Sequence, residues 1–180
     1  MWRAPNGPIE ARMNDRAADL RQAFDRSFAQ APNAEAAALE NVLAIRVGAD
    51  RYVLRLADVS GLYADKKVIS LPSPVSELLG IAGFRGAVLP VYDLGMLLGC
   101  LRAAAPRWLV VTDAAPVGLA FEGFDGYLSV RREAIVPDLR AEASGPHVRE
   151  ILQTDVARPI IHLPSVLETI RSRGGHDRRT

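Results

Sequence analysis

The sequence offers few side chains that could act as nucleophiles, general bases or metal ligands. It contains three histidines and one cysteine among 180 residues. No histidine lies at a spacing from a Cys, Ser or carboxylate that is typical of a nucleophile or a metal ligand. His162, in an apolar run, is interpreted as a core or edge histidine rather than a general base, and Cys100 as a small buried hydrophobe. No glycine-rich loop stands between a strand and a helix to hold phosphates. The sequence therefore predicts no enzyme, no cofactor and no metal site.

Arg85 is the side chain whose setting points most directly to recognition. It lies between Gly86 and the apolar run that ends at Phe84, in a turn whose neighbours are too apolar to hide a lone charge. We expect its guanidinium to project outward, where it can bind a carboxylate on a partner through two hydrogen bonds. The alternative is an intramolecular salt bridge that orders the turn.

The residues that follow Arg85 suggest an interface strand and a helix cap. Pro90, inside an apolar run, indicates an edge strand or a bulge, because a central strand would need its N–H, and interface strands lie at edges. Asp93 is expected to cap a short helical turn rather than to act as a catalytic acid. Ile81, Val88 and Val91 are candidates for a groove that faces a partner, although each could equally belong to the core.

Composition argues against a nucleic-acid or membrane protein. The net charge is only +1, and the aromatic residues, 6% of the chain, do not interleave with arginines as single-strand binding would require. The basic tail over 171–180 is expected to be disordered. No run approaches the 18 or so apolar residues of a membrane span, and Met1 to Pro8 lacks the apolar core of a secretory signal. These features predict a cytoplasmic protein without direct membrane insertion.

Residues 1–40 are predicted to form a helical extension. One apolar stripe recurs at helical spacing; its members are Met13, Ala17, Leu20, Phe24 and Phe28. The helix either packs on its own domain or docks in a groove of a partner through Leu20, Phe24 and Phe28.

The elements that must position Arg85 are short strands separated by turn residues, which favours an all-β barrel or sandwich. The expected strands are 42–47, 51–56, 59–63, 68–71, 80–84, 87–92, 108–112, 117–121, 126–130, 148–153 and 159–162. Leu94 to Leu98 is expected to be a helical turn that ends at Gly99, and Leu163 to Ile170 a closing helix with one apolar face.

The stretch Leu79 to Leu98, LGIAGFRGAVLPVYDLGMLL, resembles the central motif of CheW-like domains. In that family a Gly-Val-Ile-Asn-Leu-Arg-Gly segment leads into Pro-Val-Ile-Asp-Leu and a short helix. The residues that hold the corresponding places are Gly80, Phe84, Arg85, Gly86, Pro90, Val91, Asp93 and Leu94. The resemblance extends over roughly Asn41 to Ile170. The sequence departs from the family where Gly83 replaces an Asn and where Ile161-His162-Leu163 replaces a Leu-Leu-Asp.

The resemblance implies two SH3-like five-stranded β-barrel subdomains that share a core. By that resemblance the domain spans 41–170, one barrel taking about 52–98 and the other 41–50 plus 107–170. The N-terminal amphipathic helix and a short C-terminal helix complete the predicted fold.

The resemblance also implies an adaptor that couples chemoreceptors to a CheA-type histidine kinase. The expected partners are the regulatory domain of that kinase and the cytoplasmic tip of a methyl-accepting chemoreceptor. The residues expected to bind partners are Arg85, Phe84, Gly86, Ile81, Val88, Pro90 and Val91. The alternative is a diverged CheW-like scaffold in another pathway, such as motility or second-messenger signalling, with the N-terminal helix recruiting a different protein.

Overall fold

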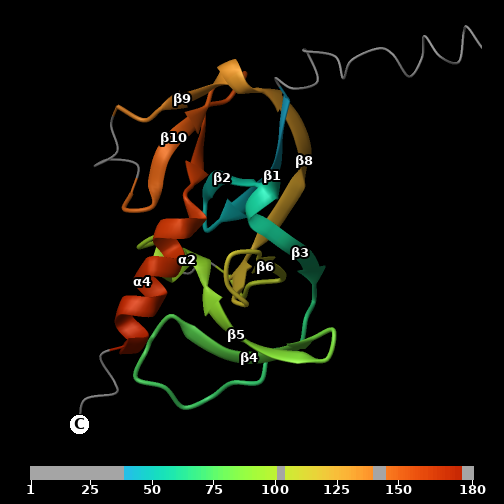
Figure 1. The fold of residues 1–180 in the computed structure, drawn as a ribbon, viewed down its shortest axis with the longest axis vertical. Coiled ribbons are helices and arrows are strands. Elements are labelled where there is room, and N and C mark those ends of the chain that lie inside the picture. Colours follow the sequence, from blue (N-terminus) through green and yellow to red (C-terminus); the bar gives the residue numbers. More distant parts are fainter. Residues whose placement is uncertain (1–38, 101–103, 140–144, 176–180) are drawn as a thin grey trace, which may run out of the picture. The chain divides into compact units, whose positions relative to one another are not determined.

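Short strands in two sheets make up most of the chain that the structure describes (Figure 1). The structure is a computed structural model, and it describes residues 39–100, 104–139 and 145–175. The prediction of a mostly β protein is confirmed. The predicted N-terminal helix, with Leu20, Phe24 and Phe28, lies outside the described residues.

In the described chain the first sheet has six strands, and it pairs the N-terminal strands of the domain with its C-terminal strands. In spatial order they are β8 (Gly123–Arg131), β1 (Leu39–Val47), β2 (Asp50–Arg55), β11 (Arg158–Ile161), β10 (Val148–Leu152) and β9 (Ile135–Pro137). The β1–β2 hairpin turns at Gly48, whose φ of 61° favours a glycine. A short parallel pairing, Ile160 opposite Val53, then brings β11 beside β2.

The second sheet has five strands. In spatial order they are β3 (Val59–Ala64), β6 (Trp108–Thr112), β7 (Gly118–Phe121), β5 (Ala87–Asp93) and β4 (Leu78–Phe84). Here β5 and β7 form the parallel pair, which begins with Val91 opposite Gly118. The 3-10 turns η2 (Leu56–Asp58) and η3 (Arg132–Ala134) lead into β3 and β9.

These pairings correct the predicted division of the chain between two barrels. The strand β2 belongs with β1 and not with 56–98, whereas β6 and β7 belong with β3, β4 and β5 and not with the C-terminal strands. The first sheet also has six strands where five were expected. The β1–β2 hairpin and the two parallel pairs determine which strands belong to which sheet. Parallel pairs join segments that are far apart in the chain, so no local turn in the sequence indicates them.

Strands buried on both faces explain the continuous apolar runs. Because side chains alternate across a strand, Val42 of β1 faces a cluster within the first sheet, while Leu43 and Ile45 face a larger cluster that both sheets share. In β7, Leu119 faces the shared cluster and Ala120 a cluster within the second sheet. Each sheet therefore has its own core and contributes to a common one.

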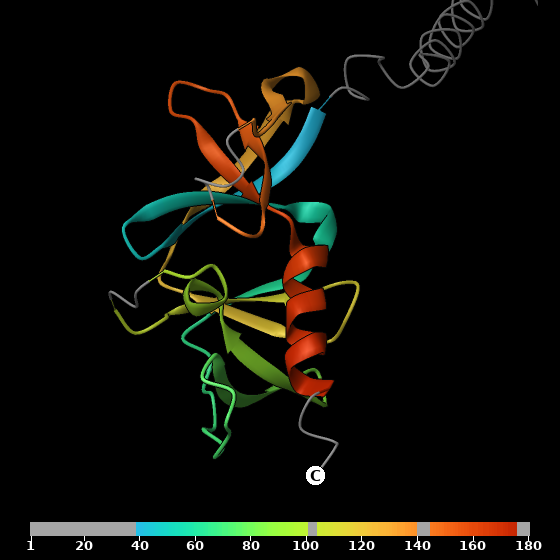
Figure 2. The ribbon, with the colours of Figure 1, turned by 90° about the vertical axis from the view of Figure 1, so that its left-hand side faces the viewer.

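The helix α4 (Leu163–Gly175) follows β11 and lies along the second sheet (Figure 2). Its apolar residues Val166, Leu167 and Ile170 pack in the shared cluster, and Arg173 forms an ion pair with Glu77 in the connection before β4. The prediction of a disordered tail from residue 171 is therefore wrong for 171–175, which continue the helix.

One predicted strand does not form. Residues 68–71 make only a single bridge, in which Ile69 and Ile81 exchange backbone hydrogen bonds of 2.8 and 2.9 Å. Pro72 and Pro74 follow at once, and each lacks the N–H that a ladder requires. By contrast, the predicted helical turn is present as α2 (Leu94–Leu97): Asp93 caps it by accepting from the Met96 N–H at 3.1 Å.

Candidate partner-binding surface

The β4–β5 hairpin carries Arg85 at its tip. Phe84 pairs with Ala87 across a two-residue turn, and Arg85 and Gly86 have φ angles of 45° and 85°. Two successive positive φ values are characteristic of a type I′ turn, whose twist matches that of the two strands. Such turns favour Asn-Gly, so a long side chain at the first position is unusual.

The Arg85 guanidinium is exposed, and no other residue in the described ranges forms a hydrogen bond or an ion pair with it. The alternative of an intramolecular salt bridge is therefore not found among the described residues. A bulky side chain in the left-handed region costs conformational energy, and no hydrogen bond or ion pair with another described residue offsets that cost.

The hairpin also presents apolar side chains to solvent. Val88 is 65% exposed, Ile69 57% and Leu71 41%, while Ile81 and Pro90 are half-buried. Ile81 lies opposite Pro90 in the register, and the bridge to Ile69 places that residue beside them. We call Ile69, Leu71, Ile81, Val88 and Pro90 the outer apolar face.

Two of the predicted contact residues belong to the core instead. Phe84 is 5% exposed and Val91 is not exposed at all, and both pack in the cluster of the second sheet. The Phe84 ring also contacts Tyr63 edge-on at 4.9 Å between centroids. Strand alternation separates these two side chains from Val88 and Pro90, which point to the opposite side of the sheet.

Pro90 is half-buried and does not lie at an edge of the sheet. The strand β5 lies between β4 and β7, so the predicted edge position is wrong. Ile81 lies opposite Pro90, and its backbone N–H and C=O form hydrogen bonds with Ile69 instead. On the other side of β5, the ladder with β7 begins only at Val91. Neither neighbouring strand therefore needs an N–H from residue 90, which is why a proline is tolerated in an interior strand.

Sequence reasoning missed Ile69 and Leu71 as surface residues. The signal was present in the two prolines at 72 and 74, which prevent the strand that would have buried alternate side chains. Once residues 68–71 form a loop against the β4 edge, apolar side chains on it stay accessible.

His147 and His162 belong to a partly buried polar cluster that the sequence spacing did not predict. His147 is 5% exposed, and its Nδ1 lies 2.9 Å from Ser165 Oγ. Ser165 Oγ also lies 2.8 Å from the His162 carbonyl oxygen, which can accept its hydroxyl proton. In that arrangement the Nδ1–H of His147 donates to Ser165. In this arrangement His147 does not accept the serine hydroxyl proton, as a histidine that activates a nucleophile does.

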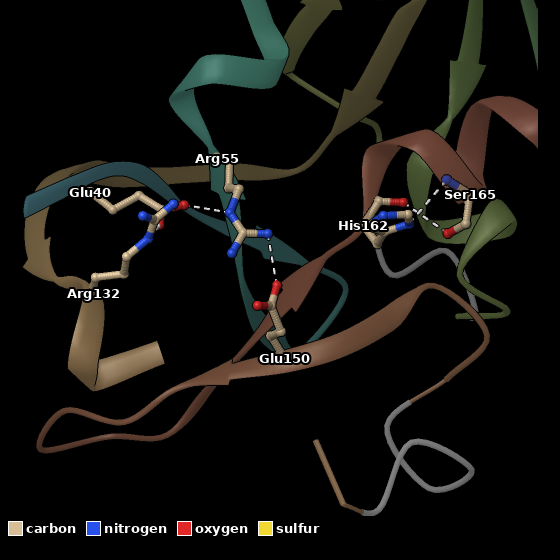
Figure 3. Close-up of polar contacts among 6 residues, drawn as sticks. All are labelled: Glu40, Arg55, Arg132, Glu150, His162 and Ser165. Atoms are coloured by element: carbon tan, nitrogen blue, oxygen red, sulfur yellow. Dashed lines mark hydrogen bonds and ion pairs between the residues drawn. The ribbon is translucent and has the colours of Figure 1, made fainter. Parts of the chain in front are cut away.

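The histidine cluster fixes the start of α4 rather than offering a base. Ser165 N–H donates to His162 Nδ1 at 3.3 Å, which caps the first turn (Figure 3). Burial lowers the pKa of both histidines, and the positive charge of Arg149 adds to this effect. Both rings are thus held neutral around pH 7.

A second polar cluster ties the strands of the first sheet together. Arg55 donates from Nε to Glu40 and from Nη1 to Glu150, the latter at 2.7 Å (Figure 3). The hydrogen bond from Arg55 lowers the pKa of Glu150. Arg132 also forms an ion pair with Glu40, with 3.9 Å between its Nε and Glu40 Oε2. One guanidinium thus joins β1, β2 and β10, which is a structural role.

Within residues 39–100, 104–139 and 145–175, no three His, Cys, Asp or Glu side chains gather where they could hold a metal ion. No helix in the same ranges is long and apolar enough to cross a membrane.

The model of the CheW-like domain family matches residues 41–171. The chain belongs to the CheW-like domain family. A probable chemotaxis protein CheW from Rhizobium etli is 27% identical over 121 residues, which are 63% of this chain and 77% of that protein. The crystal structure of the scaffolding protein TtCheW from Thermoanaerobacter tengcongensis shares the fold with a TM-score of 0.62 and 20% identity, covering 68% of this chain and 88% of that one. CheW-like proteins are chemotaxis adaptors and not enzymes, so the predicted family and adaptor role are confirmed.

Proposed function

We propose that this CheW-like protein couples chemoreceptor tips to the regulatory domain of a CheA-type histidine kinase in the cytoplasm, and that Arg85 and the outer apolar face make the contact. The observation that carries the proposal is the conformation of Arg85. Its φ of 45° is unfavourable for an arginine, and its guanidinium has no partner among the described residues. The type I′ turn requires this backbone conformation, but it does not favour an arginine, and a residue type held in an unfavourable conformation is often found at functional positions.

The surroundings of Arg85 support an interface. Isolated apolar side chains are common on protein surfaces, but contiguous ones often mark contact sites. Val88 and Ile69 are both more than 50% exposed and lie on one side of the β4–β5 hairpin, and Leu71, 41% exposed, follows Ile69 by two residues. An exposed guanidinium beside apolar residues is a common composition for the energetic centre of a protein–protein interface.

We also infer that each sheet is an SH3-like barrel, the first with one additional strand. Each sheet encloses its own apolar cluster and contains one short parallel pairing between segments far apart in sequence. Register shifts interrupt the β1–β8 and β4–β5 ladders, and such bulges help sheets to curve.

The test is affinity capture of the tagged protein from its host's lysate, compared with Arg85→Ala and with Arg51→Ala. Arg51 is a matched control because it is also exposed and lies on a hairpin of the first sheet. We expect the parent and Arg51→Ala to capture a histidine kinase and a chemoreceptor. Binding of the purified kinase regulatory domain or receptor tip to Arg85→Ala should be weaker by roughly tenfold or more, the usual cost of a lost charged hydrogen bond.

Arg85→Lys sharpens the result because lysine keeps the charge and loses the planar fork. Binding restored by lysine would indicate a simple charge effect and not paired recognition of a carboxylate. Unchanged binding by folded Arg85→Ala would remove Arg85 from the interface. Capture of another protein that depends on residues 1–38, with neither kinase nor receptor, would instead favour a diverged scaffold.

A further inference from the structure

A cavity of about 280 Å³ opens on the second sheet, away from the outer apolar face. Val68, Leu79, Leu109 and Ala120 line its floor, and all four belong to the apolar cluster of that sheet or pack against it. The cavity thus leads from the surface to the edge of a core. Its volume is just below that of typical ligand pockets, which span roughly 300–1,000 Å³ and combine an apolar lining with a few polar groups.

Two cationic side chains, Lys66 and Arg107, also line the cavity. Arg107 is held in place by Asp65, which accepts from its Nε at 3.0 Å and from its Nη2 at 3.1 Å. Asp65 neutralises that guanidinium and raises its pKa. Arg107 is thus an oriented donor rather than a free charge.

Lys66 is the uncompensated charge of the pocket. No ion pair joins its ammonium to another residue in the part of the chain that the structure describes, and the Nζ lies 4.9 Å from the centre of the Phe84 ring. A ring face attracts a cation but cannot neutralise it. The pocket therefore combines an apolar floor with one net positive charge.

We propose that this pocket binds a small organic acid. The apolar body of the acid packs on Leu79, Leu109 and Ala120, and its carboxylate binds Lys66 beside the oriented guanidinium of Arg107. A single net charge suits a carboxylate better than a phosphate, which carries nearly two negative charges at pH 7. The site is independent of the proposed partner contact, because none of its residues belongs to the outer apolar face.

Trp108 lines the same cavity and reports on its occupancy. The chain has two tryptophans, so Trp2→Phe leaves Trp108 as the only source of tryptophan fluorescence. In this background the probe is 3-phenylpropionate, and 3-phenylpropionamide is the uncharged control of the same shape. We expect a saturable fluorescence change with the acid and a much weaker response to the amide.

Lys66→Gln should raise the dissociation constant for 3-phenylpropionate roughly tenfold or more, since it removes the charged hydrogen-bond donor. Lys67→Gln is the matched control: this neighbouring lysine is exposed and does not line the cavity. Ala120→Val should abolish binding by occupying the floor. If that variant still unfolds in a cooperative thermal transition, its loss of binding is due to the filled pocket and not to a loss of the fold.

No saturable response to the acid would overturn the proposal, as would equal responses to acid and amide. An unchanged affinity of Lys66→Gln for 3-phenylpropionate would mean that the acid binds at another site, and this result would also overturn the proposal. If Lys66→Gln loses capture of the kinase or receptor while the parent shows no response to the acid, the pocket belongs to a partner contact and not to a small acid. Because fluorescence requires no partner, failure here leaves the proposed coupling function untouched.

Discussion

The carbonyl oxygen of Ile69 lies only 2.0 Å from the position that a Cβ on Gly80 would occupy. Gly80 also has a φ of 142°, which side chains rarely adopt. The loop that carries Ile69 can therefore approach the β4 edge only because residue 80 is a glycine. This contact supports the outer apolar face, since Ile69 is part of it.

Gly80→Ala should destabilise the protein by about 3 kcal/mol or more, because both the backbone conformation and the neighbouring carbonyl oppose a methyl group. Urea denaturation measures the loss. Gly83→Ala is the control in the same strand, since nothing lies within 4 Å of its added Cβ. That change should be neutral or stabilise by up to about 0.5 kcal/mol. Equal effects of the two substitutions would contradict the tight approach of Ile69.

Replacing Arg85 with a residue that suits the turn should raise stability while it weakens binding. Asn tolerates positive φ and is favoured at the first position of a type I′ turn, so Arg85→Asn should stabilise the protein by about 0.5–1 kcal/mol. Thermal unfolding and binding of the kinase regulatory domain are measured on the same preparation. A loss of stability would mean that the arginine side chain contributes to the fold.

His147 and His162 should make the protein less stable in mild acid. Burial lowers the pKa of His147 and of His162 below the ordinary 6.5, so the unfolded chain binds more protons than the folded chain as the pH falls below that value. Stability is therefore complete above about pH 6.5 and decreases below it, by at most about 1.4 kcal/mol per pH unit for each histidine.

Denaturation midpoints between about pH 7.5 and 5.5 test this linkage. Asn can replace both side-chain roles, as a donor to Ser165 at position 147 and as a helix cap at position 162. The double variant His147→Asn/His162→Asn should lose most of the pH dependence. An equally steep decline in that variant would assign the effect to other groups.

Removing the guanidinium that joins three strands should destabilise the first sheet. Arg55→Met leaves Glu40 and Glu150 without their shared donor, and because the cluster is partly exposed we expect a loss of about 1–2 kcal/mol at neutral pH. Arg51→Met, an exposed arginine in the same strand, should change stability by less than about 0.5 kcal/mol.

The effect of Arg55→Met should also depend on pH. The pKa of Glu150 is lowered from its ordinary 4.5 by Arg55, so the stabilisation that this carboxylate provides is present above about pH 4.5 and is lost as the pH falls through the folded-state pKa. Parent and variant should therefore converge in acid. A constant difference from neutral pH into acid would mean that packing of the arginine stem, and not its charge, is lost.

Local features of the sequence were sufficient for the hairpins and caps. Arg85-Gly86 between two apolar runs predicted the β4–β5 hairpin, and Asp93 predicted the cap of α2, because turns and caps depend on residues a few positions apart. The end of α4 was less well predicted: the polar residues 171–175 looked like a tail. The ion pair of Arg173 with Glu77, a residue far away in sequence, accompanies the extra helical turn.

Local residue types and one motif were sufficient to predict the β class, the family, the turn that presents Arg85 and the exposure of Arg85. The packing of remote segments was needed to establish which sheet each hairpin joins, which members of the predicted contact set are buried, and that Lys66, Arg107 and Leu79 line one cavity. Those outcomes depend on the parallel pairs β2–β11 and β5–β7, which join segments remote in the chain. Alternation along a strand predicts two faces, but only packing against the second sheet determines which face becomes core.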